Sequence, residues 1–273
     1  MFRRGRAGLN EIDFESLSRI VPPQLSFQLY SSRNFPPVEE QLSTLSRLGY
    51  RNVEPFGGLY DDPQAFKSLL DQAELAAPSG HFGLDLLEGD FSRALAIARM
   101  IGIGLIVCPW LDPSERASDA AGWRALGKRL GTLARRAQDN GLLFAWHNHD
   151  FEFRPLADGS VPIEHLMAEP ELLLELDVAW VVRGGADPAT WIERYDARIA
   201  ACHVKDLAPP GANVREDGWA DVGTGIVDWR SLWPMIVRAG AKLMIAEHDN
   251  PSDFERFARV SLAAMKQYES ARR

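Results

Sequence analysis

Short hydrophobic runs recur along the chain and are separated by segments whose apolar residues have helical spacing. Several of these runs are continuous rather than alternating, which is typical of parallel strands that are covered on both faces. We therefore expect eight strands. They lie in the runs LSFQLY (25–30), YRNVE (50–54), SGHFGL (79–84), GLIVCPW (104–110), LLFAWH (142–147), LLLELDV (172–178), IAACHVKD (199–206) and KLMIAEH (242–248).

Helix-like segments lie between most of these runs. Asp61 and Asp62 are good N-terminal residues for a helix that begins at Pro63, and Gly49 follows another amphipathic segment. The expected helices cover 37–48, 63–77, 91–102, 118–141, 188–195, 228–240 and 252–269. Strand and helix alternate about eight times over roughly 250 residues, which predicts a (β/α)8 TIM barrel.

An open, doubly wound α/β sheet is the alternative fold. It has less support, because no G-x-G-x-x-G motif follows the first strand, and Gly223 and Gly225 have the pattern of loop glycines. The sequence contains no clear domain linker, so residues 1–273 are expected to form a single domain. The basic segment 1–20 lacks the apolar stretch of a secretory signal and is interpreted as an N-terminal arm.

Composition and charge limit the classes of function. The chain is 46% hydrophobic and 25% charged, as in ordinary globular proteins. Its net charge of −8 argues against binding to nucleic-acid phosphates, which needs basic patches. No apolar run approaches the ~18–20 residues that span a membrane. The two cysteines, Cys108 and Cys202, lie in apolar runs and predict no disulfide framework, in keeping with a reducing cytoplasm.

Polar and aromatic residues gather where the predicted strands end, which is where TIM barrels carry their chemistry. Strand alternation places His203 and Lys205 on one face of their strand, and Glu175 and Asp177 on one face of theirs. We therefore expect a His, an Asp and a Glu to point together into the mouth of the barrel. The residues at the strand ends are Glu54, His81, Trp110, His147, Asn148, His149, Glu152, Asp177, Trp180, His203, Lys205, Asp206, Glu247, His248 and Asp249.

A cation would explain this gathering, because several carboxylates around one cavity repel each other or lose hydration without one. Carboxylate and imidazole ligands suit manganese, magnesium, iron, cobalt or zinc. An oxygen-rich ligand set favours manganese or magnesium, and the histidine leaves zinc and cobalt open. Each residue alone has an ordinary structural explanation: a lone His can cap a strand, Lys205 can be a surface charge, and Trp110 and Trp180 can be packing residues.

Nine short motifs give the chain a resemblance to a known family, the xylose isomerase-like TIM barrels of the sugar phosphate isomerase/epimerase superfamily. The resemblance extends from about Gln24 to Met265. Members of this superfamily that share the barrel include epimerases, inosose dehydratases, keto-glycoside epimerases and endonuclease IV. The motifs are QLYS (28–31), GYRNVE (49–54), SGHFGL (79–84), CPW (108–110), WHNHDFEF (146–153), LELDVAW (174–180), HVKD (203–206), DVGTGIVDW (221–229) and AEHD (246–249).

This resemblance implies one divalent metal ion, with manganese the first choice. The family holds it with an acid from the fifth strand region, an Asp after the sixth strand, a His after the seventh and a Glu after the eighth. Many relatives have a Glu inside the fifth strand, where this sequence has Ala145. The branch of the family with the HNH block uses instead the Glu three residues after its second His, which the resemblance matches to Glu152. The expected ligands are Glu152, Asp177, His203 and Glu247.

The resemblance also implies chemistry on a keto-sugar or keto-glycoside through an enediolate, with sugar isomerisation or epimerisation as the outcome. His149 and Glu152 are the expected acid and base, with Glu247 as an alternative, and Lys205 is expected to stabilise the oxyanion. The expected substrate-binding residues are Glu54, His81, Trp110, His147 and Trp180.

Other activities stay open. Elimination of a hydroxyl or alkoxyl group, as in inosose dehydratases or keto-glycoside lyases, needs the same metal site. An endonuclease IV-like function is disfavoured by the acidic surface and by the presence of only six histidines in the sequence. A non-catalytic sugar-binding barrel predicts the loss of a metal ligand, yet all four candidates are present. The identity of the sugar, its phosphorylation and the formation of a homo-oligomer are not decided by the sequence.

Overall fold

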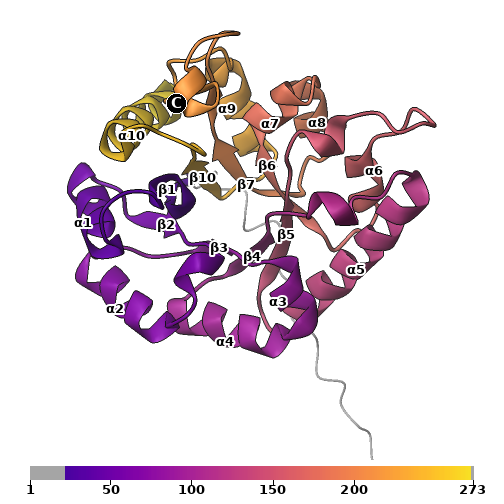
Figure 1. The fold of residues 1–273 in the computed structure, drawn as a ribbon, viewed down its shortest axis with the longest axis horizontal. Coiled ribbons are helices and arrows are strands. Elements are labelled where there is room, and N and C mark those ends of the chain that lie inside the picture. The colour runs from indigo at the N-terminus through magenta and orange to yellow at the C-terminus, as the bar shows by residue number, and fades with distance from the viewer. Residues whose placement is uncertain (1–21, 272–273) are drawn as a thin grey trace, which may run out of the picture.

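Eight parallel strands form a barrel in the computed structural model, which describes residues 22–271 (Figure 1). Each strand lies in one of the eight predicted runs, so the predicted (β/α)8 TIM barrel is confirmed. The expected arm, residues 1–20, lies outside the described residues. The barrel strands are β1 (Gln24–Gln28), β2 (Asn52–Glu54), β3 (Ser79–His81), β4 (Leu105–Cys108), β5 (Leu143–His147), β6 (Leu173–Asp177), β7 (Ile199–Val204) and β10 (Leu243–Ala246).

Strand register brings the polar residues of neighbouring strands side by side. The strands follow the order β2-β1-β10-β7-β6-β5-β4-β3, and each neighbouring pair is parallel. His147 stands opposite Glu175, and Asp177 stands opposite His203. The seam between β2 and β3 is crossed by a backbone hydrogen bond from His81 N–H to the Pro55 carbonyl, at 2.8 Å.

Helices surround the barrel as an outer ring (Figure 1). The seven predicted helices are present with shifted ends: α1 (Val38–Leu48), α2 (Pro63–Gln72), α4 (Phe91–Ile101), α5 (Ala120–Gln138), α8 (Pro188–Arg194), α9 (Trp229–Arg238) and α10 (Phe254–Ala271). Helix α2 ends before the expected residue 77, because Glu74 has a left-handed backbone (φ 56°) that a right-handed helix cannot continue. No helix of residues 22–271 is long and apolar enough to cross a membrane.

Several short elements were not predicted, because each is too short to show a hydrophobic period. They shape the loops at the mouth of the barrel. The short α-helices are α3 (Leu84–Gly89), α6 (Pro162–Leu166) and α7 (Val178–Arg183), and a hairpin joins β8 (Asp206–Leu207) to β9 (Trp219–Ala220). The 3-10 turns are Leu29–Ser32, Gly57–Leu59, Pro113–Glu115, Phe151–Phe153 and Val214–Glu216.

Alternation along the strands divides the core in two. Side chains that face the helices, such as Trp146 and Cys202, join a large core between the barrel and the helical ring. Both cysteines are buried and free, as expected. Side chains that face the barrel axis form a smaller apolar cluster: Leu105, Val107, Ala145, Ala201, Leu243 and Ile245. Toward the C-terminal ends of the same strands, the side chains that face the barrel axis are polar. These polar side chains form the candidate site.

Candidate functional site

The side chains at the end of β5 and just after it, residues 147–152, have different structural roles. His147 faces the barrel interior and is 2% exposed. The side-chain amide of Asn148 donates to the Asp177 carbonyl and its oxygen accepts from the Asp177 N–H, both at 3.0 Å. Asn148 therefore fixes the end of β5 against the end of β6, so that His147 and Asp177 are held in one plane of the barrel.

Glu152 is a buried acceptor that braces this segment. One carboxylate oxygen accepts from the indole N–H of Trp146 and the other from the backbone N–H of His149, both at 2.9 Å. Burial raises the pKa of Glu152 to about 8. In the described part of the chain, two groups of side chains can hold a metal ion, and Glu152 is in neither. The geometry therefore does not support the expectation that Glu152 is a metal ligand or a proton carrier.

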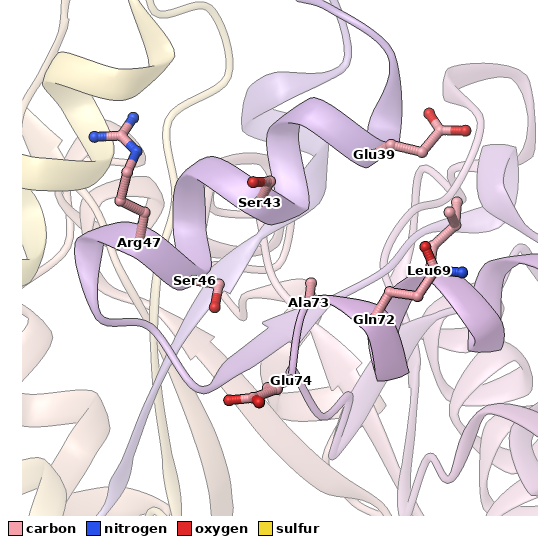
Figure 2. Close-up of a pocket in the computed structure, with 8 residues that line it drawn as sticks. All are labelled: Glu39, Ser43, Ser46, Arg47, Leu69, Gln72, Ala73 and Glu74. Atoms are coloured by element: carbon pink, nitrogen blue, oxygen red, sulfur yellow. The ribbon is translucent and has the colours of Figure 1, made fainter.

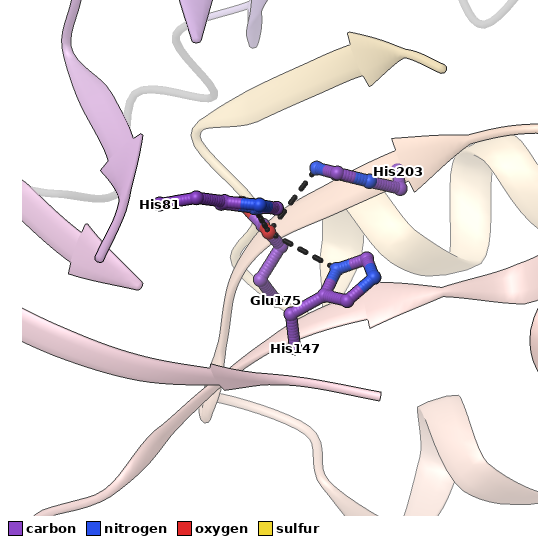
Figure 3. Close-up of side chains that lie close together, drawn as sticks. All are labelled: His81, His147, Glu175 and His203. Carbon is purple, nitrogen blue, oxygen red and sulfur yellow. Dashed lines mark hydrogen bonds and ion pairs between the residues drawn. The ribbon is translucent and has the colours of Figure 1, made fainter. Parts of the chain in front are cut away.

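The first group surrounds Glu175, on β6 (Figure 3). Its Oε2 lies 2.7 Å from His81 Nε2, 3.1 Å from His147 Nδ1 and 3.1 Å from His203 Nε2. All four side chains are buried. The alternation of β6 predicts that Glu175 faces inward with Asp177, but its part as a common partner of three imidazoles was not predicted.

Glu54 completes this buried cluster. Its Oε1 lies 2.8 Å from His203 Nε2 and 3.1 Å from His81 Nε2, and it accepts from the Gln28 side chain at 2.8 Å. Burial opposes the protonation of His81, but Glu54 and Glu175 outweigh it and raise the pKa of His81 to about 9. Glu54 is completely buried and contacts two imidazoles, and its expected part in substrate binding stays a prediction.

The second group lies at the C-terminal ends of the strands. It consists of His147, Asp177, His203 and Glu247, whose ligand atoms all lie within 4.8 Å of one another. His203 belongs to both groups, because its Nδ1 lies 2.9 Å from Glu247 Oε2 while its Nε2 faces Glu54 and Glu175. Three of these four residues, Asp177, His203 and Glu247, were predicted as metal ligands.

The chemistry of the second group suits a divalent cation. Asp177 Oδ1 accepts from the Trp180 N–H at 2.9 Å, whereas its Oδ2 is buried without a hydrogen-bond partner among residues 22–271. Burial raises the pKa of Asp177 to about 7. Its nearest cation is the Lys205 ammonium, 3.8 Å away and beyond hydrogen-bond distance, so this buried oxygen has room for a closer cationic partner. Two carboxylates and two imidazoles can hold manganese, iron, cobalt or zinc.

Lys205 is a buried ion-pair partner. Its Nζ lies 2.7 Å from Asp249 Oδ2 and 3.1 Å from Glu247 Oε2, and 4.2 Å from the centre of the Trp219 ring. Burial opposes its charge, but Asp249 and Glu247 outweigh burial and raise the pKa of Lys205. The ammonium group is enclosed by these partners and holds Glu247 in place, and its expected part in stabilising an oxyanion stays a prediction.

A cavity of about 560 Å³ opens above the second group. It brings together six of the predicted site residues: His81, Trp110, His147, His149, Trp180 and Glu247. Its other lining residues were not predicted as site residues, although Asp249 was placed at a strand end, because single residues in loops give no periodic signal. They are Tyr30, Arg33, Phe56, Gly57, Gly58, Gly83, Pro109, Asp217 and Asp249.

His149 is a neutral imidazole that lines this cavity. Its ring centre lies 4.8 Å from that of Trp110 and 5.0 Å from that of Trp180. Burial holds the pKa of His149 well below its usual value. Its Nδ1 has no hydrogen-bond partner in the described range, 22–271. A neutral imidazole can accept a proton at neutral pH.

The two loop glycines are organised by Asp206, whose carboxylate accepts the backbone N–H groups of Leu207, Gly223, Gly225 and Val227. A Cβ atom on Gly225 would lie 2.2 Å from the Leu207 carbonyl oxygen, so this position needs glycine. The N–H groups of both glycines are therefore committed to Asp206. The loop is a structural turn, as expected, and does not offer these donors to a phosphate.

A separate cavity of about 450 Å³ lies between α1 and α2, away from the barrel mouth (Figure 2). Its lining includes Glu39, Arg47 and Glu74. Neither of the two groups of metal-ligating side chains lies there. The barrel mouth therefore combines a cavity with side chains that can hold a metal ion.

Comparisons with known proteins agree with this geometry. The family model of the xylose isomerase-like TIM barrel matches residues 42–268. An inosose dehydratase of Lacticaseibacillus casei is 24% identical over 238 residues, which cover 74% of this chain and 78% of that protein. The rhizopine catabolism protein MocC of Rhizobium meliloti is 24% identical over 271 residues, covering 84% and 82% respectively.

Solved structures with the same fold include a sugar phosphate isomerase/epimerase from Parabacteroides distasonis, with a TM-score of 0.74 and 20% identity over 91% of this chain and 95% of that one. The IOLI protein with a bound zinc atom has a TM-score of 0.73 and 13% identity over 90% and 98%. These similarities establish the fold, and the family model covers most of the chain. The chain belongs to the xylose isomerase-like TIM barrel family.

Proposed function

We propose that this chain is a metal-dependent sugar isomerase or epimerase that acts on a keto-sugar or a keto-glycoside. The observation that carries the proposal is the meeting of Asp177, His203 and Glu247 beneath an open cavity, with one buried Asp177 oxygen that accepts no hydrogen bond among residues 22–271. A neutral imidazole, His149, lines the same cavity. Cation ligands and a proton acceptor are thus combined in one site.

The proposed ligands are His147, Asp177, His203 and Glu247, with manganese as the first candidate. When bound, such a cation acts as a Lewis acid that polarises a sugar carbonyl and acidifies the adjacent C–H group. Glu54 and Glu175 hold the Nε2 side of His203, so that its Nδ1 faces the other ligands. Carboxylate partners of this kind fix the orientation and tautomer of ligating histidines.

His149 is the proposed proton carrier. It accepts the proton from the carbon beside the carbonyl, and a second group acts as the acid that returns a proton. Return to the opposite face of the same carbon gives epimerisation, and return to the neighbouring carbon gives isomerisation. Glu152 positions His149 by accepting its backbone N–H. Glu247 also lines the cavity and is the alternative acid or base.

Dehydration is the second candidate reaction. It begins with the same removal of a proton beside a carbonyl and continues with loss of a β-hydroxyl group. The curated relatives described as inosose dehydratases support it, at 24% identity. A non-catalytic sugar-binding barrel is a third reading and predicts no proton exchange at all.

The test combines metal analysis with solvent exchange. Purified protein, before and after manganese loading, is assayed for metal and then incubated with keto-sugars and keto-glycosides in heavy water. We expect about one metal ion per chain and metal-dependent deuterium incorporation beside the carbonyl. His203→Asn should lose both properties. His165→Asn, on α6, is the matched control and should keep both, because His165 bonds Ser160 and is not among the residues that line the cavity. Metal without exchange on any substrate would contradict the isomerase and dehydratase assignments alike.

A further inference from the structure

Exposed aromatic rings line the cavity in addition to the polar residues that carry the proposed chemistry. Tyr30 is 39% exposed and Trp110 is 45% exposed, and both line the cavity. Phe56 and Trp180 line it as well. Large apolar side chains exposed in a concave site are typical of ligand contact surfaces.

The Tyr30 ring is held in place despite its exposure. The guanidinium group of Arg33 lies 3.8 Å from the centre of the ring. Arg33 is itself fixed, because it donates to the Tyr30 carbonyl at 2.7 Å and to the Asp249 carbonyl at 2.6 Å. Phe56 meets Tyr30 edge to face at 5.3 Å. Tyr30 is therefore an ordered surface, and a ligand that stacks on it loses little side-chain freedom.

Trp110 is held in a similar way, next to the proposed proton carrier. The Arg116 guanidinium lies 4.6 Å from its ring centre, and Phe151 lies 6.0 Å from it in an edge-on arrangement. His149 contacts Trp110 edge to face at 4.8 Å. A group that stacks on Trp110 is thus a direct neighbour of the atoms on which His149 acts.

The wall between these aromatic residues is open. Gly57, Gly58 and Gly83 line it and add no side chain. Among the polar residues of the cavity, His81, His147 and Glu247 are buried, whereas Asp217 is exposed and Arg33 and Asp249 are half-buried. A second sugar ring would need partners for several hydroxyl groups, whereas a flat apolar ring needs only the aromatic faces.

We infer that the cavity contains a second subsite, which binds a flat aromatic aglycone attached to the reacting sugar. The inference deepens the proposed function, because it selects an aryl keto-glycoside from the substrates that the metal site accepts. Tyr30 and Trp110 are the stacking residues of this subsite. The assignment of the reacting sugar rests on the proposed function, whereas the subsite rests on the aromatic lining alone.

Binding of matched keto-glycosides tests the subsite. Methyl and phenyl glycosides of the same oxidised sugar, in the glucose and galactose series, are titrated into manganese-loaded protein by calorimetry. We expect the phenyl compound of at least one series to bind roughly tenfold more tightly than its methyl partner. Trp110→Ala should reduce this ratio to about twofold or less. Trp110→Phe should retain most of it. Met100→Ala is the control, since Met100 is also 45% exposed but lies on α4 outside the cavity.

Each outcome has a defined meaning. Equal binding of methyl and phenyl compounds in both series, or no binding of either, overturns the subsite. Binding of a keto-disaccharide as tight as that of the phenyl compound overturns the aromatic assignment in favour of a second sugar. Deuterium exchange into the methyl compound, measured in parallel, separates the two proposals. Exchange without a phenyl preference rejects only the subsite, and a phenyl preference without exchange rejects only the proposed reaction.

Discussion

His203 Nδ1 lies 2.9 Å from Glu247 Oε2, on the neighbouring strand of the barrel. Strand pairing fixes this relationship, and the carboxylates of Glu54 and Glu175 on the other side of the ring keep the imidazole from turning away. A ligating pair held by backbone register is preorganised, so a cation need not order the side chains that bind it.

Asp177→Asn should abolish metal binding, because the amide lacks the charge that a cation requires. Glu152→Gln should keep about one metal ion per chain, since both of its oxygens serve as hydrogen-bond acceptors for Trp146 and His149. Metal analysis of the two variants side by side measures the difference. Loss of metal in Glu152→Gln with retention in Asp177→Asn would restore Glu152 as the ligand.

Glu175→Gln should both destabilise the protein and weaken metal binding. The substitution leaves the buried, positively charged His81 with one carboxylate partner fewer, at a cost of about 3 kcal/mol. It also removes a partner that orients His203, which should lower metal affinity about 10–100-fold. Urea unfolding and metal titration measure the two effects. Unchanged unfolding free energy and unchanged affinity together would show that the cluster around Glu175 is dispensable.

His149→Ala should lower the rate of deuterium exchange about 10²–10⁴-fold while the metal content stays constant. The wild-type rate should not fall through protonation of His149 between pH 8 and pH 6, because burial holds the pKa of His149 well below its usual value. Exchange rates over this pH range, with metal content measured at each point, provide the test. A wild-type rate in the Ala variant would assign proton transfer to another group.

Glu216 should make the protein sensitive to acid. Burial would raise the pKa of Glu216, but hydrogen bonds from Ser252 and Arg256 outweigh it and lower the pKa to about 2, from an ordinary value of 4.5. Its stabilising effect is complete above pH 4.5 and is lost as the pH falls toward 2. Thermal unfolding of the wild type and of Glu216→Gln should therefore differ at pH 7 and converge in this acid range. A constant difference would disprove the linkage.

Sequence patterns predicted the barrel because short hydrophobic runs alternate regularly with segments whose apolar residues have helical spacing. They also predicted that Asp177, His203 and Glu247 would meet, because strand alternation and a shared C-terminal edge leave inward-facing residues little choice of position. The resemblance to the family then supplied their expected role as ligands.

The environments of Glu54, Lys205 and Glu152 were not predicted. They depend on how deeply a side chain is buried and on the direction of a turn, which a hydrophobic pattern does not encode. Glu54 lies too deep along the barrel axis to line the cavity, and Lys205 is covered by its ion pairs with Asp249 and Glu247. Glu152 follows β5 in a 3-10 turn that directs it to Trp146 and His149. The contacts of Glu54 and Lys205 are with residues far along the chain, whereas those of Glu152 are set by the local turn.

Anomalous X-ray scattering from a manganese-loaded crystal tests the central claim most directly. We predict one strong anomalous peak within bonding distance of Asp177, His203 and Glu247. A peak at Glu152, a peak confined to the cluster of His81 and Glu175, or no peak after loading would contradict the site described for this barrel.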